Sequence, residues 1–157
     1  MSSPIINQYN SINKQHKEYM VFFRLGDFYE LFYEDAKEAA KILNITLTKR
    51  KQKDEDIPMA GVPFHTCEYY ISKLIQANKK IAICEQIETA SNKTEKIIKR
   101  EVTRIITPGT ITDETLLDSK RNNFLLSIYS SNNEITCSFI DLSTHEFFVE
   151  KIENLKD

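Results

Sequence analysis

The stretch YMVFFRLGDFYELF, residues 19–32, determines how the fold begins. The residues before Gly26 are almost all aromatic or apolar, and this short run predicts a mostly buried β-strand that stops at the glycine. Asp27 is suited to cap a helix, with Glu30 three residues later, and an apolar stripe at helical spacing follows as far as Leu43. The sequence therefore predicts a strand, a turn and a helix as the opening unit.

The elements on either side of this stretch follow from the same kinds of signal. Ser3-Pro4 is a helix-capping pair and predicts an N-terminal helix that ends near Gln15. The further expected elements are a short strand at 45–48, an exposed charged loop at 49–56, a proline- and glycine-stiffened loop at 57–63, a helix from Cys67, a central strand at 80–84 and a strand at 102–107. Together they predict a mixed α/β domain, a mixed sheet with flanking helices, over residues 1–118.

The pattern changes in the last part of the chain. After a short helical link at 113–117, three runs rich in β-formers at 124–129, 135–141 and 146–150 are separated by polar turns and predict an antiparallel meander. Three strands leave one sheet face without cover, so residues 119–157 are expected to form an incomplete second domain.

Composition excludes several classes of protein. The chain has 157 residues and a formal net charge of -2, which argues against nucleic-acid binding by bulk electrostatics and requires any DNA contact to be local. The three cysteines and three histidines are scattered without metal-ligand spacing, so free thiols are expected. No apolar run approaches the ~20 residues needed to cross a bilayer, and no signal peptide is present, so we expect a soluble intracellular protein.

The segment FRLGDFYELF, residues 23–32, resembles the start of the mismatch-binding domain of the MutS family. A Phe-x-Glu triplet alone occurs by chance in many proteins, whereas several family-like blocks in family order are specific. Such blocks follow at residues 35–50, 57–63, 82–86, 102–110 and 141–144. The sequence is identified as a member of this family, covering the N-terminal mismatch-binding domain and the start of the ribonuclease-H-like connector domain.

The resemblance changes the interpretation of the triplet. Periodicity alone assigns Phe28 to a core stripe and Glu30 to a helix cap. The family implies instead that Phe28 is an aromatic wedge, which enters from the minor groove and stacks on the mispaired base, and that Glu30 hydrogen-bonds the base edge. Phosphates would favour protonation of Glu30, while its ionised form would repel the backbone of matched DNA. Tyr29, between them, is expected to pack inward.

Further DNA contacts are expected from basic and loop residues. Arg100 matches a family position that contacts the DNA backbone, and Arg50 is a second candidate for a phosphate contact. Met59 and Gly61 lie in a loop that could approach the minor groove, with support of the sheet as the alternative. Weaker basic candidates are Lys93, Lys96, Lys99 and Arg104, of which Arg104 also fits a sheet residue.

The implied function is recognition of mispaired or unpaired bases in double-stranded DNA. The chain lacks the Walker A pattern G-x-x-x-x-G-K-[ST], so it is not expected to be an enzyme itself. For the parent protein the family implies ATP and Mg²⁺, a second MutS subunit, a MutL-type partner, no membrane, and a cytoplasmic, nucleoid-associated location if bacterial.

Two alternatives remain, and the chain departs from the family pattern in the last turn and in the loop at 51–56, which is more charged than usual and lacks glycine. A nuclease-like role would use Asp141, although metal-dependent cleavage needs several clustered carboxylates. A protein-interaction module that does not read mismatches is the other alternative. Relatives usually have Ser-Thr-Gly where this chain has Ser-Thr-His at 143–145, so His145 is expected in a turn that prefers a positive φ.

Overall fold

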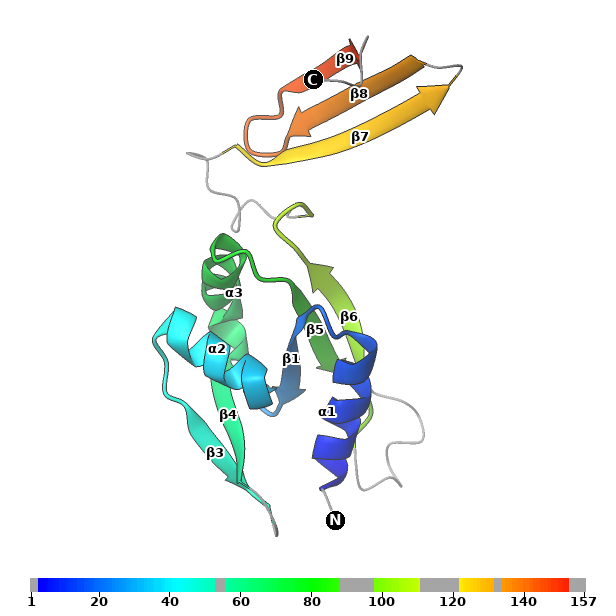
Figure 1. Ribbon diagram of the computed structural model, residues 1–157. Coiled ribbons are helices and arrows are strands. Elements are labelled where there is room, and N and C mark those ends of the chain that lie inside the picture. Colours follow the sequence, from blue (N-terminus) through cyan, green and yellow to red (C-terminus); the bar gives the residue numbers. More distant parts are fainter. Residues whose placement is uncertain (1–2, 53–55, 88–97, 111–121, 132–133, 153–157) are drawn as a thin grey trace. The chain divides into compact units, whose positions relative to one another are not determined.

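The computed structural model describes residues 3–52, 56–87, 98–110, 122–131 and 134–152. It divides into two compact units, Met1–Thr107 and Pro108–Asp157 (Figure 1). The elements are α1 (Pro4–Gln15), β1 (Met20–Leu25), β2 (Phe28–Phe32), α2 (Tyr33–Leu43), β3 (Thr48–Lys51), β4 (Asp56–Pro63), the 3-10 helix η1 (Phe64–Thr66), α3 (Cys67–Gln76), β5 (Ile81–Gln86), β6 (Arg100–Ile106), β7 (Phe124–Ser131), β8 (Glu134–Asp141) and β9 (Phe147–Ile152). The expected helical link at 113–117 lies outside the described residues.

The first unit is built on a mixed sheet in the order β3-β4-β2-β1-β5-β6. Only β1 and β5 pair in parallel, and the other neighbours in this described sheet are antiparallel. Helix α1 contacts β1 and β6, whereas α2 and α3 contact each other and β4 (Figure 1). The predicted mixed sheet with flanking helices is confirmed.

Helix α1 forms where the sequence predicts it. Ser3 caps it, because the Ser3 side chain accepts a hydrogen bond from the Ile6 N–H at 3.4 Å, and Pro4 opens its first turn. Its apolar stripe of Ile6, Tyr9 and Ile12 is buried in a core cluster with side chains from β1, β2, β4 and β5.

The segment after Gly26 differs from the prediction. Residues 28–32 form the strand β2, paired with β1 so that Leu25 lies opposite Phe28, and α2 begins only at Tyr33. The helix predicted from Asp27 is therefore wrong in its first turn. The reason is that β2 lies between β1 and β4 and buries side chains on both of its faces, so its apolar residues do not alternate and mimic a helical stripe.

Two further loop predictions are also wrong. The charged segment at 49–56 contains most of β3, since an exposed edge strand tolerates charged side chains, and the strand expected at 45–48 starts only at Thr48. The segment 57–63 is the strand β4 rather than a loop. Its prolines are tolerated because Pro58 lies beyond the part of β4 that pairs with β2, and Pro63 ends the strand.

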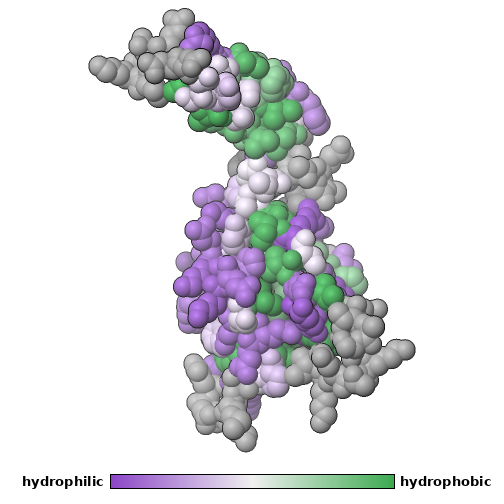
Figure 2. Space-filling view, turned by 90° about the vertical axis from the view of Figure 1, so that its right-hand side faces the viewer, coloured by the Kyte–Doolittle hydropathy of each residue, from purple (hydrophilic) through white to green (hydrophobic). Residues whose placement is uncertain are grey.

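The second unit is the antiparallel sheet β7-β8-β9, which confirms the predicted meander. His145 has a φ of 62°, as expected for the turn before β9. The unit exposes large apolar side chains: Phe124, Leu125, Leu126, Ile128, Tyr129, Phe147, Phe148, Val149 and Ile152. Figure 2 shows green, hydrophobic surface on this unit. A three-stranded sheet has too little cover to bury them.

Candidate nucleic-acid interface

The β1–β2 hairpin places Phe28 and Glu30 on one sheet face. Successive side chains of a strand point to opposite faces, and Glu30 lies opposite Phe23 on β1 and Gly61 on β4. Phe28 follows the turn directly and is 44% exposed. The structure therefore does not place Phe28 in the core, where periodicity alone would put it, but on the surface at the end of the hairpin.

Four of the predicted site residues line one hollow of about 510 Å³: Phe28, Glu30, Met59 and Gly61. The rest of its wall comes from Asn44, Ile45, Thr46 and Thr48, in the connection between α2 and β3 and at the start of β3. The motif gave no sign of this wall. The residue type that fits this part of the wall is Asn44, which ends α2 with a φ of 54°, because asparagine tolerates this left-handed conformation.

Glu30 has an unusual environment for a carboxylate. Its Oε2 is buried and makes no hydrogen bond within the part of the chain that the structure describes. Burial raises the pKa of Glu30, and the positive charge of Arg50 opposes that shift. The hollow thus contains a carboxyl group that favours binding a proton or meeting a hydrogen-bond donor.

Gly61 leaves the room that this carboxylate occupies. A Cβ atom at position 61 would lie 2.5 Å from Oε2 of Glu30 and 2.9 Å from its Cδ, which is closer than real Cβ contacts. The backbone of Gly61 is not in the left-handed region, so the absence of a side chain, not conformational freedom, is what the site requires.

Arg50 lies on the same side of the sheet as the hollow. It is opposite Ile57 on β4, two residues from the pair Thr48 and Met59, which both line the hollow. Its charge acts on Glu30, and its side chain is half-buried. The structure therefore brings five of the six predicted site residues into one region.

Arg100 lies elsewhere, at the start of β6, and is only 6% exposed. Its Nε donates to the carbonyl of Arg24 at 2.5 Å, and its Nη1 donates to Gln8 Oε1 at 3.1 Å and to the Ile98 carbonyl at 2.9 Å. Its guanidinium lies 4.9 Å from the ring centre of Phe23. These contacts join α1, β1 and β6, and the contact of Arg100 with the DNA backbone stays a prediction.

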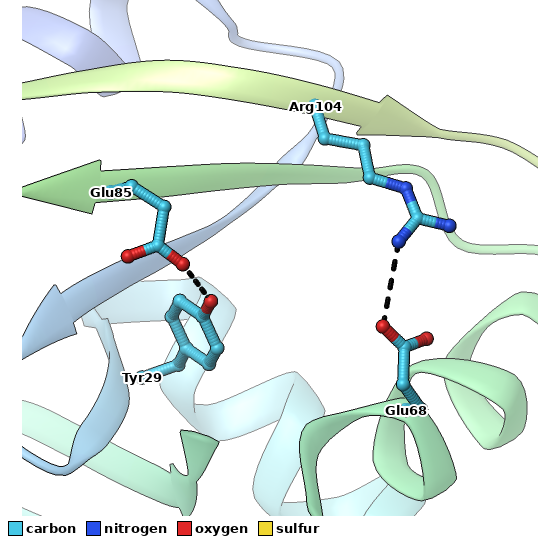
Figure 3. A network of polar contacts seen from close by, with 4 residues as sticks. All are labelled: Tyr29, Glu68, Glu85 and Arg104. Carbon is cyan, nitrogen blue, oxygen red and sulfur yellow. Dashed lines mark hydrogen bonds and ion pairs between the residues drawn. The ribbon is translucent and has the colours of Figure 1, made fainter. Parts of the chain in front are cut away.

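Two of the other basic candidates, Arg104 and Lys99, are not among the residues that line the hollow. Arg104 on β6 forms an ion pair with Glu68 of α3 at 3.4 Å (Figure 3), and Lys99 pairs with Glu101. Lys93 and Lys96 lie outside the described residues.

Tyr29 points to the opposite face from Phe28 and Glu30, as predicted. It is 5% exposed, and its hydroxyl donates a hydrogen bond to Glu85 Oε1 on β5 (Figure 3). Nothing in the sequence pattern identified Glu85 as its partner, because the contact joins residues far apart in the chain.

The structure gives no support to metal-dependent cleavage at Asp141. Its carboxylate is buried and accepts hydrogen bonds from the backbone N–H groups of Asn123 and Ser143 and from the Asn122 side chain, at 2.8–3.0 Å. These donors lower the pKa of Asp141. The hydrogen bonds indicate that the carboxylate stabilises the local turn structure around it. Among the described residues, no cluster of three or more His, Cys, Asp or Glu side chains could hold a metal ion.

Cys67, Cys84 and Cys137 are free thiols. In the ranges that the structure covers, none of the helices has the length and apolar character required to span a membrane.

Comparison with known proteins gives one consistent result. A family model described as MutS domain I matches residues 3–115. The DNA mismatch repair protein MutS of Wolbachia pipientis wMel is 48% identical over 152 residues, which are 94% of this chain and 18% of that protein. Proteins of the same name from Staphylococcus carnosus and Solibacter usitatus are 48% and 49% identical over 153 residues, 97% of this chain. The chain spans about 18% of the length of these relatives.

Proposed function

The chain belongs to the MutS family, and on that basis we propose that it recognises mispaired or unpaired bases in double-stranded DNA, as the first step of DNA mismatch repair. The observation that carries the proposal is the hollow in which exposed Phe28 and half-buried Glu30 stand two residues apart on one strand face. A protein that only needed a stable fold would gain nothing from this pair.

Phe28 is proposed as the wedge that enters from the minor groove. Opening a base step costs a few kcal/mol, least where the bases are already mispaired, and stacking on an aromatic ring returns roughly 1–3 kcal/mol. The net free energy of opening and stacking favours insertion of Phe28 at a mispair over insertion at a matched base step. Discrimination therefore comes largely from the deformability of the DNA.

Glu30 is proposed to contact the base that Phe28 displaces. Its unpaired Oε2 can accept a hydrogen bond from a base N–H, and, because burial raises the pKa of Glu30, a protonated carboxyl can donate to a ring nitrogen. When ionised, the same group repels phosphates. This would lower the affinity for matched DNA, which offers no compensating hydrogen bond.

Arg50, Met59 and Gly61 have supporting roles in the proposal. Arg50 would neutralise a phosphate, and its charge limits the pKa rise of Glu30. Met59 forms part of the apolar wall of the hollow, and Gly61 leaves space for the carboxylate. Arg100 is kept as a proposed contact to the DNA backbone outside the hollow, although its Nε and Nη1 donate to groups within the protein.

The remaining roles are proposed for the parent protein. We propose residues 1–118 as the mismatch-recognition domain and 119–157 as the start of the connector domain. ATP and Mg²⁺ binding, pairing with a second MutS subunit, contact with a MutL-type partner and a cytoplasmic location are proposed for the longer protein. This chain would supply recognition of the base and no enzymatic step.

Equilibrium binding tests the proposal. The dissociation constants of the chain for a G·T duplex, a duplex with one unpaired base and a matched duplex of the same length would be measured by fluorescence anisotropy at low salt. We expect tighter binding of the first two. Equal affinity for all three duplexes would reject mismatch recognition by this chain and favour the protein-interaction module.

A further inference from the structure

Tyr29 connects the recognition face to the opposite side of the sheet. It stands between Phe28 and Glu30, and its ring is buried on the face where those two side chains do not point. The ring packs 5.9 Å from that of Phe22, centre to centre. The backbone of residues 28–30 is therefore held by the packing of Tyr29, whose side chain lies on the sheet face opposite the hollow.

The hydroxyl of Tyr29 reaches across a whole strand. It donates to Glu85 Oε1 on β5, although β1 lies between β2 and β5 in the sheet (Figure 3). On β1, Arg24 is directly opposite Tyr29, and its guanidinium lies 5.6 Å from the Tyr29 ring centre and 3.6 Å from that of Phe64. The hydrogen bond therefore joins β2 to β5 across β1, close to the turn of the hairpin.

This bond acts on the direction of the recognition side chains. Side chains at neighbouring positions of a strand leave the backbone in opposite directions, so a rotation of β2 about its own axis moves Tyr29 one way and Phe28 and Glu30 the other. β2 has only five residues, and Phe28 is the first of them after the turn. A tether at Tyr29 limits that rotation next to the two side chains that must meet the DNA.

The hydroxyl keeps its proton for this bond. Burial first, and the contact with Glu85 second, raise the pKa of Tyr29 far above neutral pH, so the donor is present at any pH at which the protein would work. By contrast, the ion pair of Glu68 with Arg104, on the same face, joins α3 to β6 and does not include β2 (Figure 3).

We propose that the Tyr29–Glu85 hydrogen bond holds β2 in the orientation that aims Phe28 and Glu30 at the DNA, so that Tyr29 and Glu85 are positioning residues for mismatch recognition. The inference rests on the proposed function of the hollow. It adds two residues that do not touch the DNA but determine how well mispairs are told from matched pairs.

The test compares the whole chain with Tyr29→Phe, Glu85→Leu, Glu85→Gln and the double variant Tyr29→Phe/Glu85→Leu. Tyr9→Phe is the matched control, because the Tyr9 hydroxyl also donates to a half-buried carboxylate, Asp35 Oδ2 at 3.2 Å, which lies on α2 and not on a strand of the sheet. For each protein, the ratio of the matched to the G·T dissociation constant is measured. Unfolding by urea is followed in parallel.

Tyr29→Phe and Glu85→Leu should each lower the ratio by about two- to tenfold, the usual range for one hydrogen bond. The double variant should lose no more than the worse single variant, since both remove the same bond. Glu85→Gln retains an acceptor oxygen and should restore most of the ratio, and Tyr9→Phe should leave it unchanged. A residue that acted only on stability would lower both affinities together and leave the ratio as it is.

Tyr29→Phe with an unchanged ratio would overturn the inference. If the unaltered chain shows no preference for the mismatch, the proposed function fails, and amide hydrogen exchange in the free chain then decides the positioning claim by itself. The claim requires faster exchange of the β2 amides in Tyr29→Phe than in Tyr9→Phe, with β6 unchanged in both. Equal exchange of β2 in the two variants would refute it.

Discussion

Phe28 and Glu30 are each costly to a folded protein and lie two residues apart. A phenylalanine with 44% exposure keeps apolar surface in water. The buried Oε2 of Glu30 has no hydrogen-bond partner among the described residues, and such a group carries a desolvation penalty of about 1–3 kcal/mol. Residues that reduce stability while sharing one hollow are expected where a ligand compensates for them. At the scale of single residues, three substitutions test whether that ligand is a mispaired base.

Phe28→Ala should weaken binding of the G·T duplex by about 5- to 150-fold, the range that corresponds to losing one base–aromatic stack. Binding of the matched duplex should change little, because no ring is inserted there. Tyr69→Ala removes another exposed ring, 58% accessible and on α3, and should alter neither affinity. Fluorescence anisotropy would measure the dissociation constants of the unaltered chain and of both variants for each duplex. An equal loss of affinity for both duplexes in Phe28→Ala would contradict the role of Phe28 as a wedge.

Glu30→Gln should change how stability depends on pH. Burial raises the pKa of Glu30, so the folded chain binds the proton more tightly than the unfolded chain, whose glutamates titrate near about 4.3. The free energy of unfolding should then fall as pH rises through the raised pKa, and Glu30→Gln should remove that part of the fall.

Urea unfolding of both proteins at pH 4 and pH 7 measures this effect. The stability of Glu30→Gln relative to the unaltered chain should be greater at pH 7 than at pH 4. Asp35, whose pKa burial also raises, is present in both proteins, so its effect cancels in the comparison. A difference that is the same at both pH values would show that Glu30 does not titrate as the structure indicates.

Gly61→Ala should impair discrimination more than folding. The new Cβ would meet the end of the flexible Glu30 side chain, which can move, so the free energy of unfolding should change by less than about 1 kcal/mol. The displaced carboxylate should reduce the preference for mispairs. In a Glu30→Ala background, Gly61→Ala should have no further effect on binding, and an additive loss would count against the contact.

At the scale of elements, the predicted and the observed secondary structure differ most at the β1–β2 hairpin. The sequence predicts α1, β1, α3, β5 and the meander, because each has either one buried face or a clear capping or turn signal. It does not predict β2, since Asp27 with Glu30 imitates a capping box and the apolar residues from Phe28 onward also fit a helical stripe. Long-range pairing overrides that local signal.

The candidate site shows the same division. Phe28 and Glu30 could be named from the family resemblance, and Met59 and Gly61 from the room that a glycine gives for close approach to DNA. The structure brings all four to one hollow. The wall from residues 44–48 and the partner Glu85 could not be named, because only the folded sheet brings them beside the triplet. Arg100 matches a family position that contacts the DNA backbone, but the burial of its side chain could not be foreseen from the sequence.

Substitutions of Gly26, in the turn of this hairpin, should lower the free energy of unfolding by different amounts. Gly26 has a φ of +62°, a region that costs an ordinary L-residue roughly 1–2 kcal/mol, and no atom lies near its would-be Cβ. Gly26→Ala should lower the free energy of unfolding by about 1 kcal/mol. Gly26→Asn should lower it less, because asparagine tolerates positive φ. Equal stability of all three proteins in urea would mean that the turn does not constrain the hairpin.

The charge of the whole molecule sets how it can hold DNA. With a formal net charge of -2 and Arg50 beside the hollow, few phosphates can be neutralised. The slope of log K against log salt should therefore lie between about -1 and -4, at roughly 0.9 per phosphate contact. Arg50→Ala should make the slope shallower by about 1 and weaken both duplexes alike. A slope steeper than about -6 would indicate bulk electrostatic binding instead.

The most direct test of the central claim is a backbone amide shift titration of the isotopically labelled whole chain with a G·T duplex and its matched twin, at low salt, repeated with Phe28→Ala. The account predicts shifts centred on residues 26–30 that are larger for the mismatch and disappear in the variant. Equal shifts for both duplexes, unaffected by Phe28→Ala, would contradict it.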